Sequence, residues 1–297
     1  MKSSLVCIVD IELLESRSRI LNLNINFIEI KSLRDAKKNI LGKVQFIQAS
    51  KCKDLSPGTL NPKNSKYVLD NLNFGIAQSL KNKKVGLVTG PIQKSNIIDG
   101  GFKSFQGHTE WIKKKTKSNH VVMLLSSKKI KVALATTHIP LAEVPKNIQK
   151  SKLVEIIKIL HSGLKTKFKI RNPVITVLGL NPHAGEDGKI GPEEIKIINP
   201  AVQICRDIGI NASYAISADT AFSAKKLEKT DAYLAMYHDQ ALPVLKAFSF
   251  GEAINITLGT SIVRTSVDHG TALDIAGKMK PNLGSIKEAI KLAEIQL

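Results

Sequence analysis

Three histidines in this 297-residue sequence follow apolar segments with the length and composition of buried β-strands. His138 follows VALATT, His183 follows VITVLGLNP, and His238 follows AYLAMY. Because the carboxyl ends of parallel strands meet at one edge of a sheet, we expect these three side chains to converge. Three imidazoles suit Zn²⁺ or a similar divalent ion and leave positions open for a substrate. The spacing therefore predicts a catalytic metal site, against the alternative of three ordinary loop histidines.

Acidic residues accompany the histidines. Asp239 directly follows His238, and Glu186 follows His183 in the string NPHAGEDG. Carboxylates in such positions orient metal-bound imidazoles or act as ligands themselves. Asp239 and Asp219, the latter in the string SADT, are candidates for moving protons during catalysis. Helix capping is the alternative role for Asp219.

A second set of residues suits a polar, anionic substrate. His108 and Thr109, in the string GHTE, are candidates for contacting it, with helix capping as the alternative for Thr109. Arg264 stands in a stretch of apolar and small residues, where an unpaired guanidinium would be costly, so it should meet a carboxylate or phosphate. With Lys246 and Asn255 it would form an anion clamp. The alternative is an internal salt bridge.

The elements that must position these residues alternate between strands and helices. From about residue 84 onward, short apolar runs alternate with amphipathic stretches of helical period, which is typical of βαβ units and a mainly parallel sheet. SLVCIVD and INFIEI, near the start, also look like strands. No strand leads into G-x-G-x-x-G, so a dinucleotide would have to bind without the Rossmann fingerprint. The other predicted strands are 84–90, 121–127, 131–137, 174–180, 232–237 and 253–259, and the predicted helices are 64–81, 145–161, 192–208 and 283–296.

Composition narrows the class of protein. No apolar run approaches the roughly 18 residues of a membrane helix, and the first residues are unlike a secretory signal, so we expect a cytoplasmic protein with no membrane partner. The three cysteines are far apart and fit reduced thiols. The net charge of +19 raises nucleic acid as a partner, but 38 of the 44 basic residues are lysine and aromatics are 5%. We therefore expect no nucleic-acid partner; salt-dependent retention on DNA would contradict this.

Seven strings, taken together and in order over roughly residues 60–297, resemble the 4-hydroxythreonine-4-phosphate dehydrogenase family of vitamin B6 biosynthesis. The strings are TGPxxK, GHTE, ATTHIPL, GLNPHAGE, SADT, MYHDQALPVLK and NITLG…RTSVDHGTALDIAG. The resemblance implies that one divalent ion per site (Zn²⁺, Mg²⁺ or Co²⁺) is bound by His138, His183 and His238. It implies that the substrate is bound by His108, Thr109, Lys246, Asn255 and Arg264.

The fold that this resemblance implies is similar to that of isocitrate and isopropylmalate dehydrogenases: an α/β fold of two α/β/α lobes with a mainly parallel sheet and a cleft between them. Residues 1–107 with 244–297 would form the lobe on the cofactor side. Residues 108–243 would form the lobe on the metal and dimer side. These relatives bind NAD without the Rossmann fingerprint, so NAD or NADP is expected at His269, Gly270, Thr271, Ala272 and Asp274.

The implied activity is NAD-dependent, metal-dependent oxidation of 4-phosphooxy-L-threonine to 2-amino-3-oxo-4-phosphooxybutanoate, which decarboxylates to 3-amino-2-oxopropyl phosphate. The implied assembly is a homodimer whose active site lies at the subunit interface. A paralogous dehydrogenase of threonate or erythronate phosphate is an alternative. The family's first strand and its loop resembling GEPAGIGPE have no counterpart here, as if the sequence began roughly thirty residues late. A truncated, non-catalytic homologue is therefore a further alternative.

Overall fold

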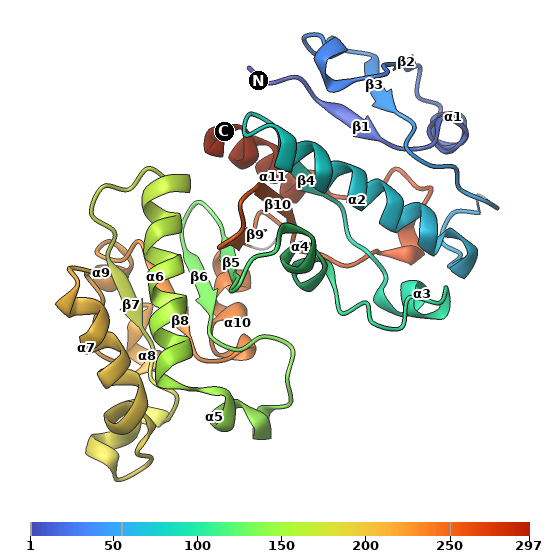
Figure 1. Ribbon diagram of the computed structural model, residues 1–297. Coiled ribbons are helices and arrows are strands. Elements are labelled where there is room, and N and C mark those ends of the chain that lie inside the picture. Colours follow the sequence, from blue (N-terminus) through green and yellow to red (C-terminus); the bar gives the residue numbers. More distant parts are fainter. Residues whose placement is uncertain (1, 55, 250) are drawn as a thin grey trace.

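Short strands and helices alternate along the chain, and the strands form two separate sheets (Figure 1). The structure is a computed structural model that describes residues 2–54, 56–249 and 251–297. The smaller sheet is parallel throughout, in the order β1-β3-β2. Its strands are β1 (Val6–Ile8), β2 (Asn26–Glu29) and β3 (Lys43–Ile47).

The larger sheet has the order β4-β10-β9-β5-β6-β8-β7. The pairs β4–β10, β6–β8 and β8–β7 are parallel, whereas β10–β9, β9–β5 and β5–β6 are antiparallel. Two of the antiparallel pairs, β5–β6 and β9–β10, join consecutive strands through short turns, which cannot make a parallel crossover. The strands are β4 (Gly86–Thr89), β5 (Val122–Ser126), β6 (Lys131–Leu134), β7 (Ile175–Val177), β8 (Ala232–Ala235), β9 (Ile254–Leu258) and β10 (Val263–Val267).

Helices cover both faces of the larger sheet (Figure 1). Successive side chains of a strand point to opposite faces, so Val132 packs with the cluster under α10 and Ala133 with the cluster under α6 and α7. The predicted α/β fold is therefore confirmed. The helices are α1 (Ile11–Ile20), α2 (Ser65–Lys81), α3 (Lys94–Asp99), α4 (His108–Thr116), α5 (Val144–Asn147), α6 (Lys150–Lys167), α7 (Asn199–Asp207), α8 (Ala218–Ala221), α9 (Ala224–Leu227), α10 (His238–Ser249) and α11 (Gly284–Gln296).

Several elements differ from the sequence-based expectation; β3, α4 and α10, for example, were not predicted. The predicted helix 145–161 is interrupted at Ile148, where the backbone is extended between α5 and α6. The predicted helix 192–208 begins as a π-helical turn, Glu194–Ile198, and continues as α7. Strand β10 was not predicted, because three consecutive polar residues, Arg264, Thr265 and Ser266, stand between its two valines. All five of its residues are nevertheless buried.

The residue ranges of the two predicted lobes divide the strands of the larger sheet between them. Residues 108–243 supply the consecutive strands β5, β6, β8 and β7, and β4, β10 and β9 come from the other predicted lobe. The antiparallel β9–β5 pair lies at the junction, so one sheet runs through both parts. The lobe boundaries themselves stay a prediction. No helix in the described ranges is long and apolar enough to cross a membrane.

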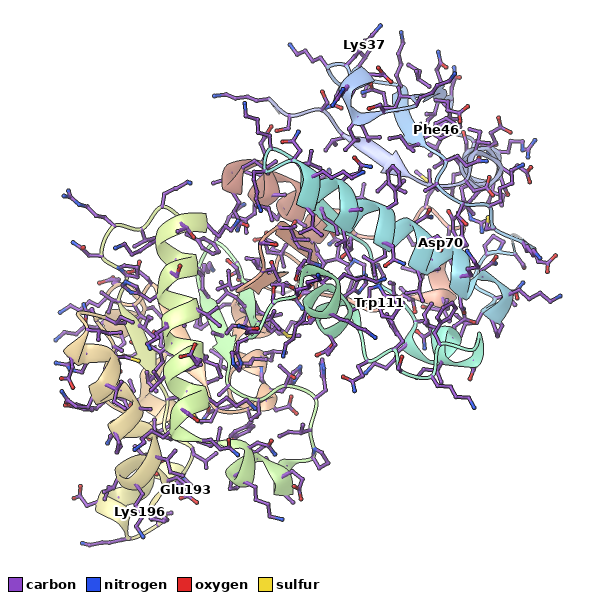
Figure 2. All side chains as sticks on the ribbon, in the orientation of Figure 1. Lys37, Phe46, Asp70, Trp111, Glu193 and Lys196 are labelled. Atoms are coloured by element: carbon purple, nitrogen blue, oxygen red, sulfur yellow. The ribbon has the colours of Figure 1, made fainter. Side chains whose placement is uncertain are left out.

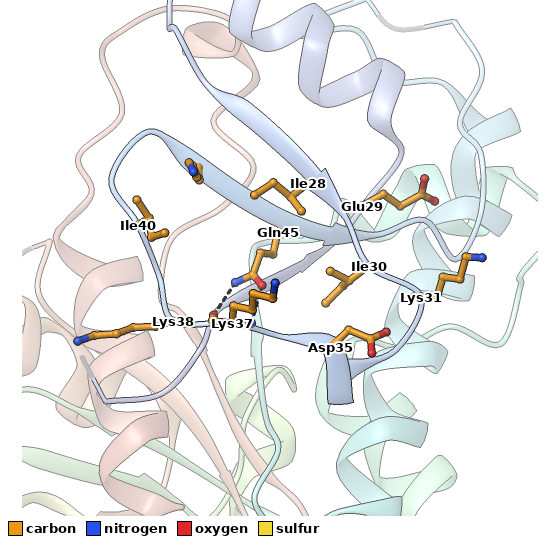
Figure 3. Close-up of a pocket in the computed structure, with 10 residues that line it drawn as sticks. Ile28, Glu29, Ile30, Lys31, Asp35, Lys37, Lys38, Ile40 and Gln45 are labelled. Carbon is orange, nitrogen blue, oxygen red and sulfur yellow. Dashed lines mark hydrogen bonds between the residues drawn. The ribbon is translucent and has the colours of Figure 1, made fainter.

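The smaller sheet is held together partly by a buried glutamine. Gln45 of β3 exchanges two hydrogen bonds of 2.7 Å with the backbone N–H and C=O of Lys37 (Figure 3). These bonds fix the connection between β2 and β3 against the sheet, beside a cavity of about 590 Å³ that is lined by lysines and isoleucines.

A groove of about 1250 Å³ separates the two sheets. Among the described strands, β1 and β4 are edge strands, and residues from both line the groove together with residues of α2 and α11. Helix α2 contacts both edges at Gly75, where an added Cβ would lie 2.7 Å from Leu87 and 3.2 Å from Ile8. One end of the groove reaches Thr89 and His108, the first residues of the candidate site.

Candidate active site

Arg264 is the second residue of β10, and only 2% of its surface is exposed. Its guanidinium donates from Nη2 to Thr89 Oγ1 (2.8 Å) and from Nη1 to Thr257 Oγ1 (3.2 Å). Its Nε has no partner among the described residues. Burial lowers the pKa of Arg264 to about 10, which leaves the side chain charged at neutral pH. A buried cation whose hydrogen bonds go to neutral hydroxyls is suited to receive an anion.

His108 begins α4 and lines the groove beside Thr89. Burial, and then the charge of Arg264, lower the pKa of His108 to about 3. The ring is therefore neutral at physiological pH, with one nitrogen donating and the other accepting. Thr109 is buried within α4, and Gly107 occupies the N-cap position, so the capping alternative for Thr109 is wrong.

The other two members of the predicted clamp lie close to β10. Lys246 of α10 forms an ion pair with the buried carboxylate of Asp268, which directly follows β10. For Arg264 itself the salt-bridge alternative is wrong, because its partners among the described residues are the hydroxyls of Thr89 and Thr257. Asn255 of β9 pairs in register with Ser266 of β10, and its Oδ1 is buried without a partner in the described structure. That oxygen can accept a hydrogen bond from a bound substrate.

His138 and His238 lie side by side, with ring centroids 5.6 Å apart and the rings tilted by 45°. They are adjacent because the parallel β6–β8 pair continues past the strands, where Thr136 donates from its backbone N–H and its hydroxyl to the carbonyl of Met236. Burial, followed by the proximity of His238 and Lys94, lowers the pKa of His138 and favours the neutral, metal-binding form.

His183 opens a loop of unusual conformation after β7. Residues 183–187 all have positive φ, between 45° and 81°, and four of the five are not glycine. Each such residue costs about 1–2 kcal/mol. Nδ1 of His183 lies 3.9 Å from Oδ2 of Asp219. Across the described ranges, no three His, Cys, Asp or Glu side chains are grouped closely enough to hold a metal ion. The structure therefore brings two of the three histidines together and pairs the third with an aspartate.

The two predicted proton-moving residues each accompany a histidine. Oδ1 of Asp239 lies 2.5 Å from Nδ1 of His238. Asp219 is exposed, and a hydrogen bond from the Ser217 hydroxyl lowers the pKa of its carboxyl. Ser217, not Asp219, occupies the N-cap position of α8, so the capping alternative for Asp219 is wrong.

Charges on α3 and α4 act on one of the candidate metal ligands. Lys94 at the start of α3 lowers the pKa of His138, and Glu110 of α4 raises it. The residue affected follows β6, and one of the two charges comes from α4, the helix that also carries His108.

The predicted cofactor loop follows β10 and is largely exposed. Thr271 donates from Oγ1 to Oε1 of Gln93 (2.9 Å), which links the loop to the segment after β4. Nothing lies within 4 Å of where a Cβ of Gly270 would stand, so a ligand has room to approach the backbone there. The exposed members of the set are His269, Gly270, Ala272 and Asp274.

Several residues of the site were not predicted. Thr89 and Thr257 hold the guanidinium, and Asp268 holds Lys246. Thr89 and Asp268 stand inside strings already identified, TGPxxK and VDHG, so their position beside Gly-containing turns was the available signal. Thr257 had no comparable signal, because its role depends on the β9–β10 pairing.

The low pKa of His108 predicts acid sensitivity of the free protein. The folded state keeps the ring neutral down to about pH 3, whereas the unfolded chain takes up a proton near pH 6.5. The unfolded state therefore binds more protons below pH 6.5, and lowering the pH to 5 should cost about 2 kcal/mol of stability from this group. Urea unfolding at pH 7 and pH 5 measures this loss. His108→Asn should lose less stability over the same interval, and an equal loss would contradict the prediction.

Similarity to known proteins extends over nearly the whole chain. A family model described as pyridoxal phosphate biosynthetic protein PdxA matches residues 1–293. A 4-hydroxythreonine-4-phosphate dehydrogenase of Pseudoalteromonas translucida is 45% identical over 296 residues, which cover 98% of this chain and 89% of the relative. One from Chromobacterium violaceum is 46% identical over 97% of this chain and 87% of the relative.

A solved structure has the same architecture. The crystal structure of a 4-hydroxythreonine-4-phosphate dehydrogenase from Klebsiella pneumoniae superposes with a TM-score of 0.83 at 30% identity, covering 97% of this chain and 89% of that one. The sequence match, the shared fold and the resemblance of the site strings agree. The chain therefore belongs to the PdxA family of pyridoxal phosphate biosynthetic proteins.

Proposed function

We propose that the chain oxidises 4-phosphooxy-L-threonine with NAD⁺ and a divalent metal ion. The product would be 2-amino-3-oxo-4-phosphooxybutanoate, which loses CO₂ to give 3-amino-2-oxopropyl phosphate. The observation that carries the proposal is the buried, positively charged Arg264, whose side-chain hydrogen bonds go to two threonine hydroxyls. Such a group needs an anionic partner, and the substrate carries a phosphate and a carboxylate.

Substrate binding is assigned to the residues beside β9 and β10. Arg264 would hold an anionic group of the substrate, and Lys246, poised by Asp268, would add a second positive charge. The unpartnered Oδ1 of Asn255 would accept a hydrogen bond from an ammonium or hydroxyl group. The neutral ring of His108 would contact a hydroxyl or phosphate oxygen, with Thr109 behind it in α4.

The histidines fit a divalent ion in their chemistry. His138 and His238 present neighbouring rings, and the lowered pKa of His138 favours the neutral imidazole that binds metals. We assign His138, His183 and His238 as the ligands of one divalent ion: Zn²⁺, Mg²⁺ or Co²⁺. When bound, such an ion would lower the pKa of the substrate hydroxyl and polarise the oxygen of the resulting ketone.

The carboxylates beside the histidines would move or hold protons. Asp239 accepts at Oδ1 from Nδ1 of His238, which turns the other ring nitrogen toward a ligand. Asp219 would take part in moving the proton of the substrate alcohol; the hydrogen bond from Ser217 lowers the pKa of its carboxyl, so it would hold that proton only weakly. Hydride transfer requires NAD or NADP, which we place on the open loop His269–Asp274.

We further propose a homodimer in which the ligands of each metal come from both subunits. The support is the arrangement of the histidines in one chain: His138 and His238 are adjacent, whereas the neighbour of His183 is Asp219. No group of three metal-binding side chains forms within the described part of a single chain. A second subunit would complete the set.

The proposed function is tested by measuring NADH formation from 4-phosphooxy-L-threonine. The protein is stripped with a chelator and assayed alone and with Zn²⁺, Mg²⁺ or Co²⁺, using NAD⁺ and NADP⁺ in parallel. We expect metal-dependent reduction of at least one of the two. Failure with every metal and both nucleotides would refute the proposal.

The choice of substrate is tested in the same assay. Threonate and erythronate phosphates differ from the proposed substrate mainly by having a hydroxyl in place of the amino group. We expect lower kcat/KM for these compounds. A higher value for either of them would identify a paralogous dehydrogenase.

A further inference from the structure

The loop that carries His183 begins near Gly179, whose surroundings include side chains from two other elements. Gly179 lies two residues after the end of β7, and a Cβ at this position would lie 2.9 Å from Cα of Ala184 and 3.0 Å from Oε1 of Glu194. The backbone of Gly179 is thus enclosed between the loop that carries His183 and a carboxylate. A shift of the Gly179 backbone would therefore move His183.

Glu194 holds the loop from one side. It stands at the start of the π-helical turn, and only 2% of its surface is exposed. Oε1 accepts from the backbone N–H groups of Leu180 (2.7 Å) and Asn181 (2.8 Å), and Oε2 accepts from Nδ2 of Asn181 (2.9 Å). Because a buried carboxylate needs several donors, these bonds fix both partners.

Gln240 contacts Gly179 from a second element, helix α10. It lies in the first turn of α10, two residues after His238. Its Nε2 donates to the carbonyl of Gly179 (2.6 Å), and its Oε1 accepts from the N–H of Met236 (2.7 Å). One side chain therefore ties the end of β8, where His238 begins its helix, to the start of the His183 loop.

We propose that Glu194 and Gln240 are positioning residues that fix the His183 loop against the ends of β7 and β8. The proposal rests on the proposed function, in which His183 binds a metal ion. The five residues with positive φ would otherwise relax toward common backbone conformations, and His183 would lose its place. Neither Glu194 nor Gln240 needs to touch the metal or the substrate for this role.

The first test uses the full chain without metal. Hydrogen exchange is measured at the amides of Leu180 and Asn181 in the wild type, Glu194→Gln and Gln240→Glu. We expect at least about tenfold faster exchange in Glu194→Gln, because an amide replaces one accepting oxygen. Gln240→Glu places a carboxylate against the Gly179 carbonyl and should loosen the same segment. If Glu194→Gln does not fold, Gln240→Glu still tests the proposal.

A matched control is available next to Glu194. Glu193 also accepts a hydrogen bond from Nδ2 of Asn181 (2.8 Å), but it is only partly buried and takes no backbone N–H of the loop. Figure 2 shows Glu193 at the end of the molecule opposite Phe46 of the smaller sheet, so the change is remote from that sheet. Glu193→Gln should leave the exchange of Leu180 and Asn181 unchanged.

The second test measures Co²⁺ affinity by absorption spectroscopy and calorimetry. We expect Glu194→Gln and Gln240→Glu to weaken Co²⁺ binding by about 10- to 100-fold, with Glu193→Gln unaffected. Unchanged exchange in both variants, or looser exchange with wild-type Co²⁺ affinity, would overturn the proposal. Absence of Co²⁺ binding by the wild type would instead refute the metal part of the proposed function. The hydrogen-exchange rates of Leu180 and Asn181 would then still show whether Glu194 and Gln240 fix this segment.

Discussion

Arg264→Met is expected to stabilise the free protein and to remove nearly all of its activity. Methionine has a similar length and carries no charge, so the cost of burying an unpaired guanidinium disappears. The free energy of unfolding should rise by about 1–4 kcal/mol in urea titrations without substrate. The lost contact with an anionic group is worth about 2–5 kcal/mol, so kcat/KM should fall roughly 30- to 5,000-fold.

Arg264→Lys is the control for charge alone. Lysine keeps a positive charge, but it has one nitrogen where the guanidinium has three. It cannot donate to Thr89 and Thr257 as the two guanidinium Nη atoms do and also present a nitrogen to the substrate. We expect partial activity and no gain in stability. If Arg264→Met unfolds more easily than the wild type, the guanidinium supports the fold and the assignment of an anion site loses its main support.

Mixing two inactive variants should restore activity if the metal ligands come from both subunits. His183→Ala and His238→Ala should each lose metal and at least about a thousandfold in activity, because either change removes a ligand. Each site is expected to take His138 and His238 from one subunit and His183 from the other. In a mixed dimer, one site therefore contains both substituted residues, and the other site contains three intact histidines. Random exchange of subunits makes half of the dimers mixed, so about a quarter of wild-type activity should return.

The mixing experiment needs a control in which recovery is impossible. His138→Ala mixed with His238→Ala serves this purpose, because those two rings are adjacent in one chain and should belong to the same site. Their mixed dimers would have one substituted ligand in each site and should stay inactive. Recovery in the control, or none with His183→Ala, would show that the three ligands are shared in a different way.

The strand ends could be predicted from sequence because each depends on local pattern. The apolar runs before His138 and His238 did form neighbouring parallel strands, and their convergence followed from that geometry alone. His183 was also placed after a strand, but its left-handed loop was not foreseen, since four of its five residues with positive φ carry side chains that disfavour this conformation.

Pairings between distant segments could not be predicted in the same way. An apolar run does not show the direction of its neighbour, so the antiparallel β9–β5 pair was missed. Strand β10 was missed because Arg264 is buried by both flanking strands and by two hydroxyls, which no periodicity reveals. The roles of Glu194 and Gln240 depend likewise on tertiary contacts with Gly179.

The groove between β1 and β4 has a thermodynamic consequence. No strand pairing connects the two sheets in the described structure, so the smaller sheet is joined to the rest mainly by side-chain contacts with α2 and α11. Its backbone hydrogen bonds can therefore break without disturbing those of the larger sheet. The protein should open in two cooperative units, with the first 50 residues unfolding at a lower free energy than the part that carries the histidines and Arg264.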